Sequence, residues 1–274
     1  MKSSKDAIPD HDSLKGYIAE VLGTFTLTFV SCWTVIACYE FSKDVSSSCF
    51  LVALAPALVT FAFLNFGTPS SQTTLNPALT LALVIMNKQS WSTGMKYVLL
   101  QLTGAVVAAG FIFIQLSKAQ FDKLAGTTVL GIPVKGSAEY ASSVLVGEFI
   151  GSFLLGYTYM SLFAGEASQR NAKVGSAAVA LVLFLSLFCL SEVFGVGLNP
   201  ARSLGPAIIS GRVGKLQFEQ VAGPVFGCLL GAILQVSIFV SDDEEEEEAR
   251  EAADESQRKL RLDNGAQDVE LEEK

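Results

Sequence analysis

The four residues Leu-Asn-Pro-Ala occur twice in this chain, at positions 75–78 and again at positions 198–201. In both copies an Asn precedes a Pro, and mostly apolar residues follow. Asn caps the free N–H groups at the start of a helix, and Pro is favoured at the first helical position. The two copies therefore predict helices that run from Asn76 to about Met86 and from Asn199 to about Ile209.

Both predicted helices are too short to cross a membrane. Eleven residues at 1.5 Å each span about 16 Å, roughly half of a hydrocarbon core. Two half-helices that enter from opposite faces would meet at the centre with their positive N-terminal ends, and the amides of Asn76 and Asn199 would act there as hydrogen-bond donors. Two ordinary helix starts in loops are the simpler interpretation, but the matching placement of both copies favours paired half-helices.

The composition is that of a membrane protein. Of 274 residues, 50% are hydrophobic and only 17% are charged, whereas soluble domains carry about 25% charged residues. We therefore predict an all-α membrane protein with six transmembrane helices and two re-entrant half-helices. The six spans are expected near residues 17–39, 49–67, 95–117, 141–164, 174–194 and 218–240.

The two halves of the chain repeat each other. Residues 20–25 match 148–153, the Leu-Asn-Pro-Ala segments match, and Gly104-Ala105 matches Gly227-Cys228, at offsets of 128, 123 and 123 residues. Each half holds three predicted spans, an odd number, so the second half is inverted relative to the first, and such 3+3 repeats place a pathway near the midplane. The expected organisation is a tail (1–16), a channel domain (17–240, with repeats 17–117 and 141–240) and a second tail (241–274).

The net charge of −8 comes from the C-terminal tail. Residues 241–274 hold 15 acidic and 5 basic residues, which leaves the rest of the chain at +2, so no nucleic-acid partner is expected. Six crossings put both termini on one side, and the acidic tail indicates that this side is cytosolic, because Lys and Arg are spread too evenly to decide. A solvated tail is its simpler interpretation, and a site for regulation or a basic partner is the alternative.

The inventory of reactive side chains is small. The chain has one histidine, His11, and its five cysteines have no CxxC spacing. This pattern excludes sites that need two histidines, and it predicts buried thiols. We expect no enzyme activity, no metal site and no cofactor.

Taken together, the motifs resemble those of the aquaporins, the major intrinsic protein family. The resemblance covers residues 17–240 and rests on the segments 19–25, 76–80, 101–105, 197–206 and 223–227. It implies a bundle with one pore per subunit and a homotetramer in the lipid bilayer. It also implies a passive channel that conducts water and excludes protons and ions, in either a plasma membrane or a vacuolar-type membrane.

The resemblance also assigns residues to the pore. Its central motifs would be Asn76, Pro77, Ala78, Asn199, Pro200 and Ala201. Glu20 and Glu148 are expected to hold the re-entrant loops by accepting backbone N–H bonds, and a proton relay is the alternative. Gly195 and Gly197 are expected to permit the unusual backbone before the second half-helix.

The expected selectivity filter departs from the family pattern. Arg202, three residues after Asn199, matches the constriction Arg; a snorkelling interfacial Arg is the alternative. The other filter positions fall on Pro56 or Ala57, on Leu187 and on Val196, where the family often has an aromatic residue, His and Cys. These residues predict a wider, apolar filter.

Three other functions remain open at this point. A broader pore for glycerol, urea, ammonia or hydrogen peroxide follows from the apolar filter. An alternating-access transporter would need a coupling-ion site at mid-depth, for which the chain offers only Glu20 and Glu148. A membrane scaffold that uses the acidic tail is disfavoured because Asn76, Asn199 and Arg202 are all present.

Overall fold

A computed structural model describes residues 13–41, 45–66, 73–117, 119–120, 141–163, 172–194, 196–211, 213 and 218–238. The segment up to residue 12, Gly195 and the acidic tail lie outside the described residues. The described helices are α1 (Leu14–Phe41), α2 (Val45–Phe66), α3 (Pro77–Ile85), α4 (Trp91–Gln115), α6 (Ala141–Met160), α8 (Ala172–Phe194), α9 (Pro200–Ile209) and a C-terminal helix (Phe218–Ile238). A 3-10 turn, Ser161–Phe163, extends α6.

Six of the described helices are long enough to cross a membrane. Five of them, namely α1, α2, α4, α6 and the C-terminal helix, combine this length with an apolar composition. The sixth, α8, has 23 residues, about 34 Å, and contains the shorter apolar stretch Val174–Leu190. The predicted all-α membrane fold is therefore confirmed, and the long helices coincide with the predicted spans to within a few residues.

Several helix ends differ from their predictions by up to four residues, and one of these differences has a visible cause. The third span was expected from residue 95, but α4 begins at Trp91. The reason is a helix cap that lies before the apolar stretch: the Ser90 hydroxyl accepts the Thr93 N–H at 3.2 Å, and Ser is among the preferred N-cap residues.

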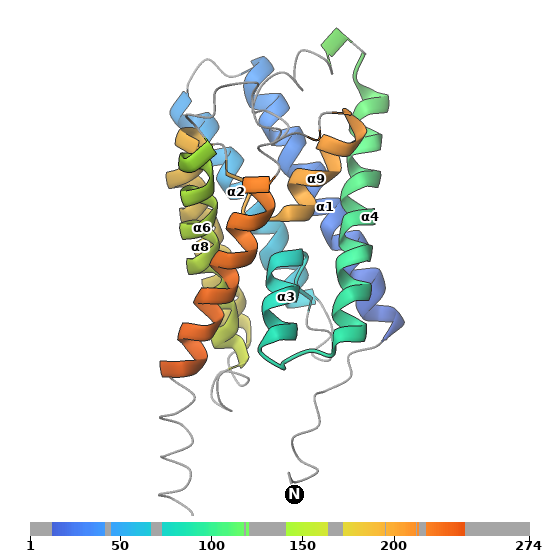
Figure 1. The fold of residues 1–274 in the computed structure, drawn as a ribbon. Coiled ribbons are helices and arrows are strands. Elements are labelled where there is room, and N and C mark those ends of the chain that lie inside the picture. Colours follow the sequence, from blue (N-terminus) through green and yellow to red (C-terminus); the bar gives the residue numbers. More distant parts are fainter. Residues whose placement is uncertain are drawn as a thin grey trace, which may run out of the picture.

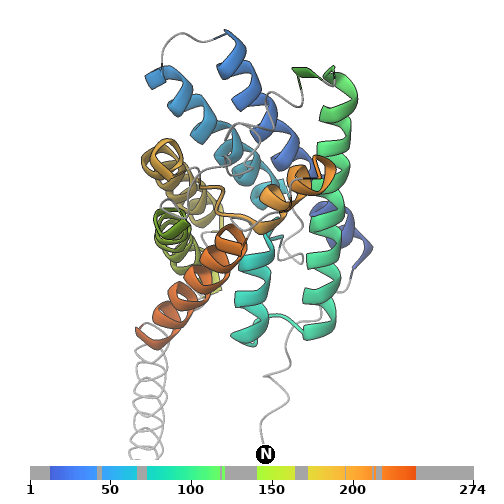
Figure 2. The same cartoon turned by 45° about the horizontal axis from the view of Figure 1, so that its top comes forward.

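The second half of the bundle is inverted relative to the first. In Figure 1, α1 rises from its start at the lower end, whereas α6 descends from its start at the upper end. The half-helix α3 occupies the lower half of the bundle and α9 the upper half. Figure 2 shows α1 and α4 on one side, α6 and α8 on the other, and the two half-helices between them.

Close helix crossings at glycines hold each half together. A Cβ atom on Gly104 of α4 would lie 2.5 Å from the Val21 carbonyl oxygen of α1, and one on Gly227 would lie 2.3 Å from the Phe149 carbonyl oxygen of α6. Both glycines therefore allow backbone-to-backbone contact, which is how membrane helices pack closely. Because Gly104 and Gly227 are repeat equivalents, the two crossings are symmetric.

We expect Gly104→Ala to destabilise the protein and Gly110→Ala, six residues further along α4, to leave it unchanged or slightly more stable. The added methyl group at position 104 meets backbone that cannot rotate away, at a cost of about 1–3 kcal/mol. A Cβ at position 110 would meet nothing within 4 Å. The remaining effect of Gly110→Ala is a smaller conformational entropy of the unfolded chain, which favours the folded protein slightly. Thermal unfolding of both variants in detergent checks this, and equal midpoints would contradict the crossing.

Candidate functional site: two re-entrant segments that meet at the centre

The backbone before each half-helix makes the same turn. Leu75 and Leu198 have φ values of 54° and 55°, in the left-handed region that costs a non-glycine residue about 1–2 kcal/mol. The positive φ falls on Leu198 and not on the neighbouring Gly197, which is not among the described positive-φ residues. The reason lies in packing, because the turn needs a large apolar side chain at the leucine position.

Each leucine side chain packs against a glycine on the first helix of its own repeat. A Cβ on Gly23 of α1 would lie 2.2 Å from Leu75 Cδ2, and a Cβ on Gly151 of α6 would lie 2.6 Å from Leu198 Cδ2. Leu75 and Leu198 are 1% and 0% exposed. Leu75 and Leu198 are therefore packed at equivalent positions of the two repeats. The burial of their side chains offsets the strain of the left-handed backbone.

The two asparagines connect the repeats to each other. The Asn76 amide Nδ2 donates to the Leu198 carbonyl at 2.8 Å, and the Asn199 Nδ2 donates to the Leu75 carbonyl at 2.7 Å. Each Asn oxygen accepts a backbone N–H at the start of its own half-helix, from Ala78 at 2.9 Å or from Ala201 at 3.0 Å. An amide nitrogen carries two hydrogens, so each Asn retains one N–H for another acceptor.

The Pro and Ala residues of each motif complete these helix starts. Pro77 and Pro200 occupy the first helical position, and Ala78 and Ala201 follow with 0% exposure. A larger side chain than alanine would have no room at this junction. The positive ends of α3 and α9 therefore meet near the centre of the bundle, with the two Asn amides between them.

Two buried glutamates accept the N–H groups of the re-entrant segments. Glu20 accepts the N–H groups of Thr74 at 2.6 Å and Leu75 at 2.9 Å. Glu148 accepts those of Gly197 at 2.7 Å and Leu198 at 2.8 Å. Both carboxylates are 0% exposed, so they satisfy donors that neither water nor the half-helices could reach.

The first repeat holds its loop with additional side chains that the sequence did not single out. The Gln101 Nε2 donates to Glu20 at 2.8 Å and lies 2.8 and 2.9 Å from the hydroxyls of Thr74 and Thr80. The Thr80 hydroxyl donates in turn to the Asn76 carbonyl at 3.1 Å. This chain of bonds links Glu20 to the backbone of Asn76. The one feature of the sequence that pointed to Gln101 is that it lies in a segment, 101–105, that resembles the family.

The second repeat lacks this network. The positions equivalent to Thr74, Thr80 and Gln101 are Gly197, Ser203 and Pro224. Pro224 offers no side-chain donor, and the buried Ser203 hydroxyl has no hydrogen-bond partner among the described residues. The described bonds that hold the segment 196–199 are therefore the two to Glu148 and the two crossed Asn bonds.

A tyrosine from the opposite half contacts the first loop. The Tyr159 hydroxyl of α6 donates to the Thr73 carbonyl at 2.8 Å, and Tyr159 is 2% exposed. Nothing in the local sequence marked this residue, because its partner lies 86 residues away.

Arg202 lies in the first turn of α9, and its side chain is half-buried. Its backbone N–H donates to the Asn199 Oδ1 at 3.3 Å. A Cβ on Gly197 would lie 3.1 Å from Arg202 Nη1 and 2.8 Å from Ser203 Oγ. Gly197 therefore provides the space into which the guanidinium folds, which explains a glycine at a position without a positive φ.

We expect Gly197→Ala to displace the Arg202 side chain and to alter selectivity more than folding. The new methyl group would press on Arg202 Nη1 and Ser203 Oγ, which are side-chain atoms that can move. Water and glycerol permeability, measured on equal amounts of folded protein, should change in ratio. An unchanged ratio would show that Arg202 does not border the pathway.

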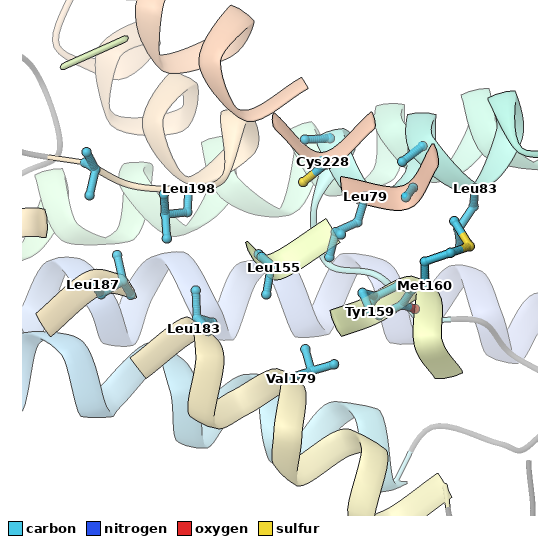
Figure 3. Close-up of a cluster of buried hydrophobic side chains, with 14 of the residues drawn as sticks. Leu79, Leu83, Leu155, Tyr159, Met160, Val179, Leu183, Leu187, Leu198 and Cys228 are labelled. Carbon is cyan, nitrogen blue, oxygen red and sulfur yellow. The ribbon is translucent and has the colours of Figure 1, made fainter. Parts of the chain in front are cut away.

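The other residues expected to form the filter lie at buried sites. Pro56 and Ala57 are buried inside α2, and Leu187 and Val196 are 6% and 3% exposed within one apolar cluster that also holds Leu198. Figure 3 shows Val179, Leu183 and Leu187 in a row along α8, on the side that faces Leu155 and Leu198. Most of the described side chains in this cluster are aliphatic.

One aromatic ring, the half-buried Phe184, packs against this cluster. Phe184 stacks on Phe188 at 5.7 Å and meets Phe50 edge-on at 5.4 Å. Phe188 and Phe50 are 42% and 46% exposed, and Phe61 is 39% exposed. Tyr159 is a buried member of the same cluster.

These features define a class of protein: a membrane bundle with inverted halves, two half-helices and paired Asn-Pro-Ala motifs at their junction. The sequence profile described as "Major intrinsic protein" matches residues 8–239, and the chain belongs to this family. It is similar to human Aquaporin-5, with 30% identity over 223 residues that cover 81% of this chain and 79% of the relative. It is also 30% identical to maize (Zea mays) Aquaporin NIP1-1 over 78% of this chain and 71% of that protein.

A solved structure supports the fold. The X-ray structure of the aquaglyceroporin from Plasmodium falciparum superposes with a TM-score of 0.64 and covers 82% of this chain and 96% of that chain. At 20% sequence identity, this similarity concerns the fold alone.

Proposed function

We propose that this protein is a passive channel that conducts water along osmotic gradients and excludes protons and ions. The observation that carries the proposal is the reciprocal pair of bonds between each Asn amide and the carbonyl that precedes the other Asn. This pair fixes both amides at the junction of the half-helices, with one N–H of each left for a passing molecule.

The same geometry accounts for proton exclusion. Water that enters must exchange its bulk hydrogen bonds for partners on the wall, or entry costs several kcal/mol. At the junction it meets donors from Asn76 and Asn199, so it accepts hydrogen bonds and cannot pass a proton along a continuous chain. The converging positive ends of α3 and α9 raise the energy of any cation at the same place.

Arg202, Pro56 or Ala57, Leu187 and Val196 form the selectivity filter in this proposal. The half-buried guanidinium supplies polar contacts and repels cations, and the other positions supply an aliphatic wall. Glu20 and Glu148 hold the loops in place and do not relay protons, because their described contacts are donors from the loops and from Gln101.

A broader pore for small neutral solutes is the second candidate. The observation that favours it is the absence of an aromatic residue at the proposed filter positions themselves, although Phe184 packs against the cluster that holds Leu187 and Val196. Without an aromatic wall or a His donor, discrimination would depend mainly on size. Glycerol, urea, ammonia and hydrogen peroxide are the solutes to examine.

Stopped-flow swelling of proteoliposomes tests both candidates. We expect water flow that is linear in the osmotic gradient, with a low activation energy and without proton flux. Restoring bulk by Leu187→His together with Ala57→Phe should reduce glycerol or urea flux more than water flux. Saturable flux, or flux that needs an ion gradient, would instead indicate an alternating-access transporter.

The assembly and topology follow from the same proposal. We infer a homotetramer with one pore per subunit, a channel domain at 17–240 and both termini in the cytosol, without enzymatic activity. In support, the start of α1 and the end of the C-terminal helix lie at the same end of the bundle (Figure 1). Cross-linking in membranes and protease access to an N-terminal epitope test these points.

A further inference from the structure

The helices α1 and α4 run parallel and begin side by side. Tyr17 meets Tyr97 edge-on with ring centroids 6.0 Å apart, and further along Trp33 Nε1 donates to Gln115 Oε1 at 2.9 Å. Because the contacts advance together along both helices, both N-termini lie at the same end of the bundle (Figure 1).

Two lysines lie at this end on α1 and α4. Lys15 is exposed on α1, and the Lys96 ammonium of α4 lies 5.6 Å from the centroid of the Tyr17 ring. The positive ends of two helix dipoles add to these charges. Among the described residues of this end, the acidic side chain is Glu20, which is 0% exposed.

Exposed apolar side chains continue from each lysine toward the middle of the membrane. Ile18 and Leu22, three and seven residues after Lys15, are 48% and 53% exposed. Val107, eleven residues after Lys96, is 44% exposed. These spacings place each lysine and its apolar residues on one face of its helix. On this face, the lysines at the helix starts are followed by exposed apolar side chains deeper in the membrane.

We propose that one anionic phospholipid binds to this α1–α4 face. Its phosphate lies at the level of Lys15 and Lys96, and its acyl chains run along Ile18, Leu22 and Val107. The charge and the apolar rows match the two parts of such a lipid. The chemistry required is a phosphodiester headgroup without a compensating ammonium.

A second copy of the chain fits this face less well. Subunits related by rotation about the membrane normal keep every residue at its own depth. Lys15 and Lys96 would therefore face the same end of a neighbour, where the described residues present no exposed acidic side chain. A phosphate at that depth is attracted by both lysines and by the helix N-termini, whereas the described residues of a neighbouring copy offer no anionic group there.

Quenching by brominated lipids tests the proposal. The chain has two tryptophans, Trp33 and Trp91, so Leu22→Trp in a Trp33→Phe, Trp91→Phe background reports on this face alone. Each lysine contributes about fivefold to the affinity for an anionic surface. We therefore expect dibrominated phosphatidylglycerol to bind about 25-fold better than dibrominated phosphatidylcholine at this reporter.

Two controls make the test specific. Lys15→Gln with Lys96→Gln should bring the preference close to one, whereas Lys43→Gln with Lys118→Gln, which follow the opposite ends of the same helices in the sequence, should leave it intact. Native Trp91, five residues from Lys96 and so about 140° around α4, should show no preference in the Trp33→Phe protein.

Three outcomes would overturn the proposal. Equal quenching by both lipids at the introduced tryptophan would show that the face does not select charge. An equal loss in both double-lysine variants would show a general surface potential instead of a site. Quenching by neither lipid in the assembled protein would show that a second copy covers the face.

Discussion

Glu148→Ala is expected to abolish water conduction and to reduce the amount of folded protein severely. The substitution leaves the N–H groups of Gly197 and Leu198, now 2.7 and 2.8 Å from the carboxylate, buried without an acceptor. Each such group costs about 1–3 kcal/mol, so the total of about 2–6 kcal/mol is comparable to the stability of a whole domain. Size-exclusion profiles and osmotic permeability per folded protein measure the two effects.

The conservative variants sharpen this prediction. Glu148→Gln places an amide NH2 against a backbone donor, and the described hydrogen bonds of Glu148 involve no other side chain. In Glu20→Gln the new NH2 group has a possible partner, because the buried Oε1 of Gln101 has no hydrogen-bond partner among the described residues. We therefore expect Glu148→Gln to be the more damaging substitution, and the reverse order would contradict the difference between the two loop anchors.

Arg202→Ala is expected to increase proton or cation leak about a hundredfold while water still flows. Arg202 is the one cationic side chain on the described re-entrant segments, 73–85 and 196–211. A unit charge about 6 Å from a permeating cation raises its energy by about 3 kcal/mol at an effective dielectric constant of 20, which corresponds to about a hundredfold in rate. Proton flux is read with an internal pH dye, and water flow by light scattering on the same vesicles.

Arg202→Lys is the matched control for that variant. It retains the charge but loses the planar guanidinium, so leak should stay low. If Arg202→Ala folds normally and its leak does not rise, Arg202 lies outside the pathway, and the interpretation as an interfacial, snorkelling arginine becomes the better one.

The sequence was sufficient for the architecture because the architecture depends on local and periodic signals. The Asn-Pro starts at Asn76 and Asn199, the apolar spans and the constant offset between repeats all predict elements that the structure contains. The equivalence of Gly104 and Gly227 was also visible, although not the backbone contact that each one makes.

Local sequence patterns did not predict the backbone conformation and the long-range hydrogen bonds of the site. Leucine is an unusual residue for a positive φ, so Leu75 and Leu198 gave no sign of their conformation, which depends on packing against Gly23 and Gly151. The bonds of Gln101 and Tyr159 join residues 81 and 86 positions apart. Such partners become evident when the helices are docked, because no periodicity encodes them.

The crossed bonds between the repeats have a consequence for the order in which the protein is made. The Asn76 amide donates to the Leu198 carbonyl, 122 residues later in the chain. At about 5–20 residues per second, the ribosome needs about 6–24 s to supply that partner. During this interval the first re-entrant segment lacks its bonds to the second half. The two crossed Asn bonds therefore form late, after the second half has been made.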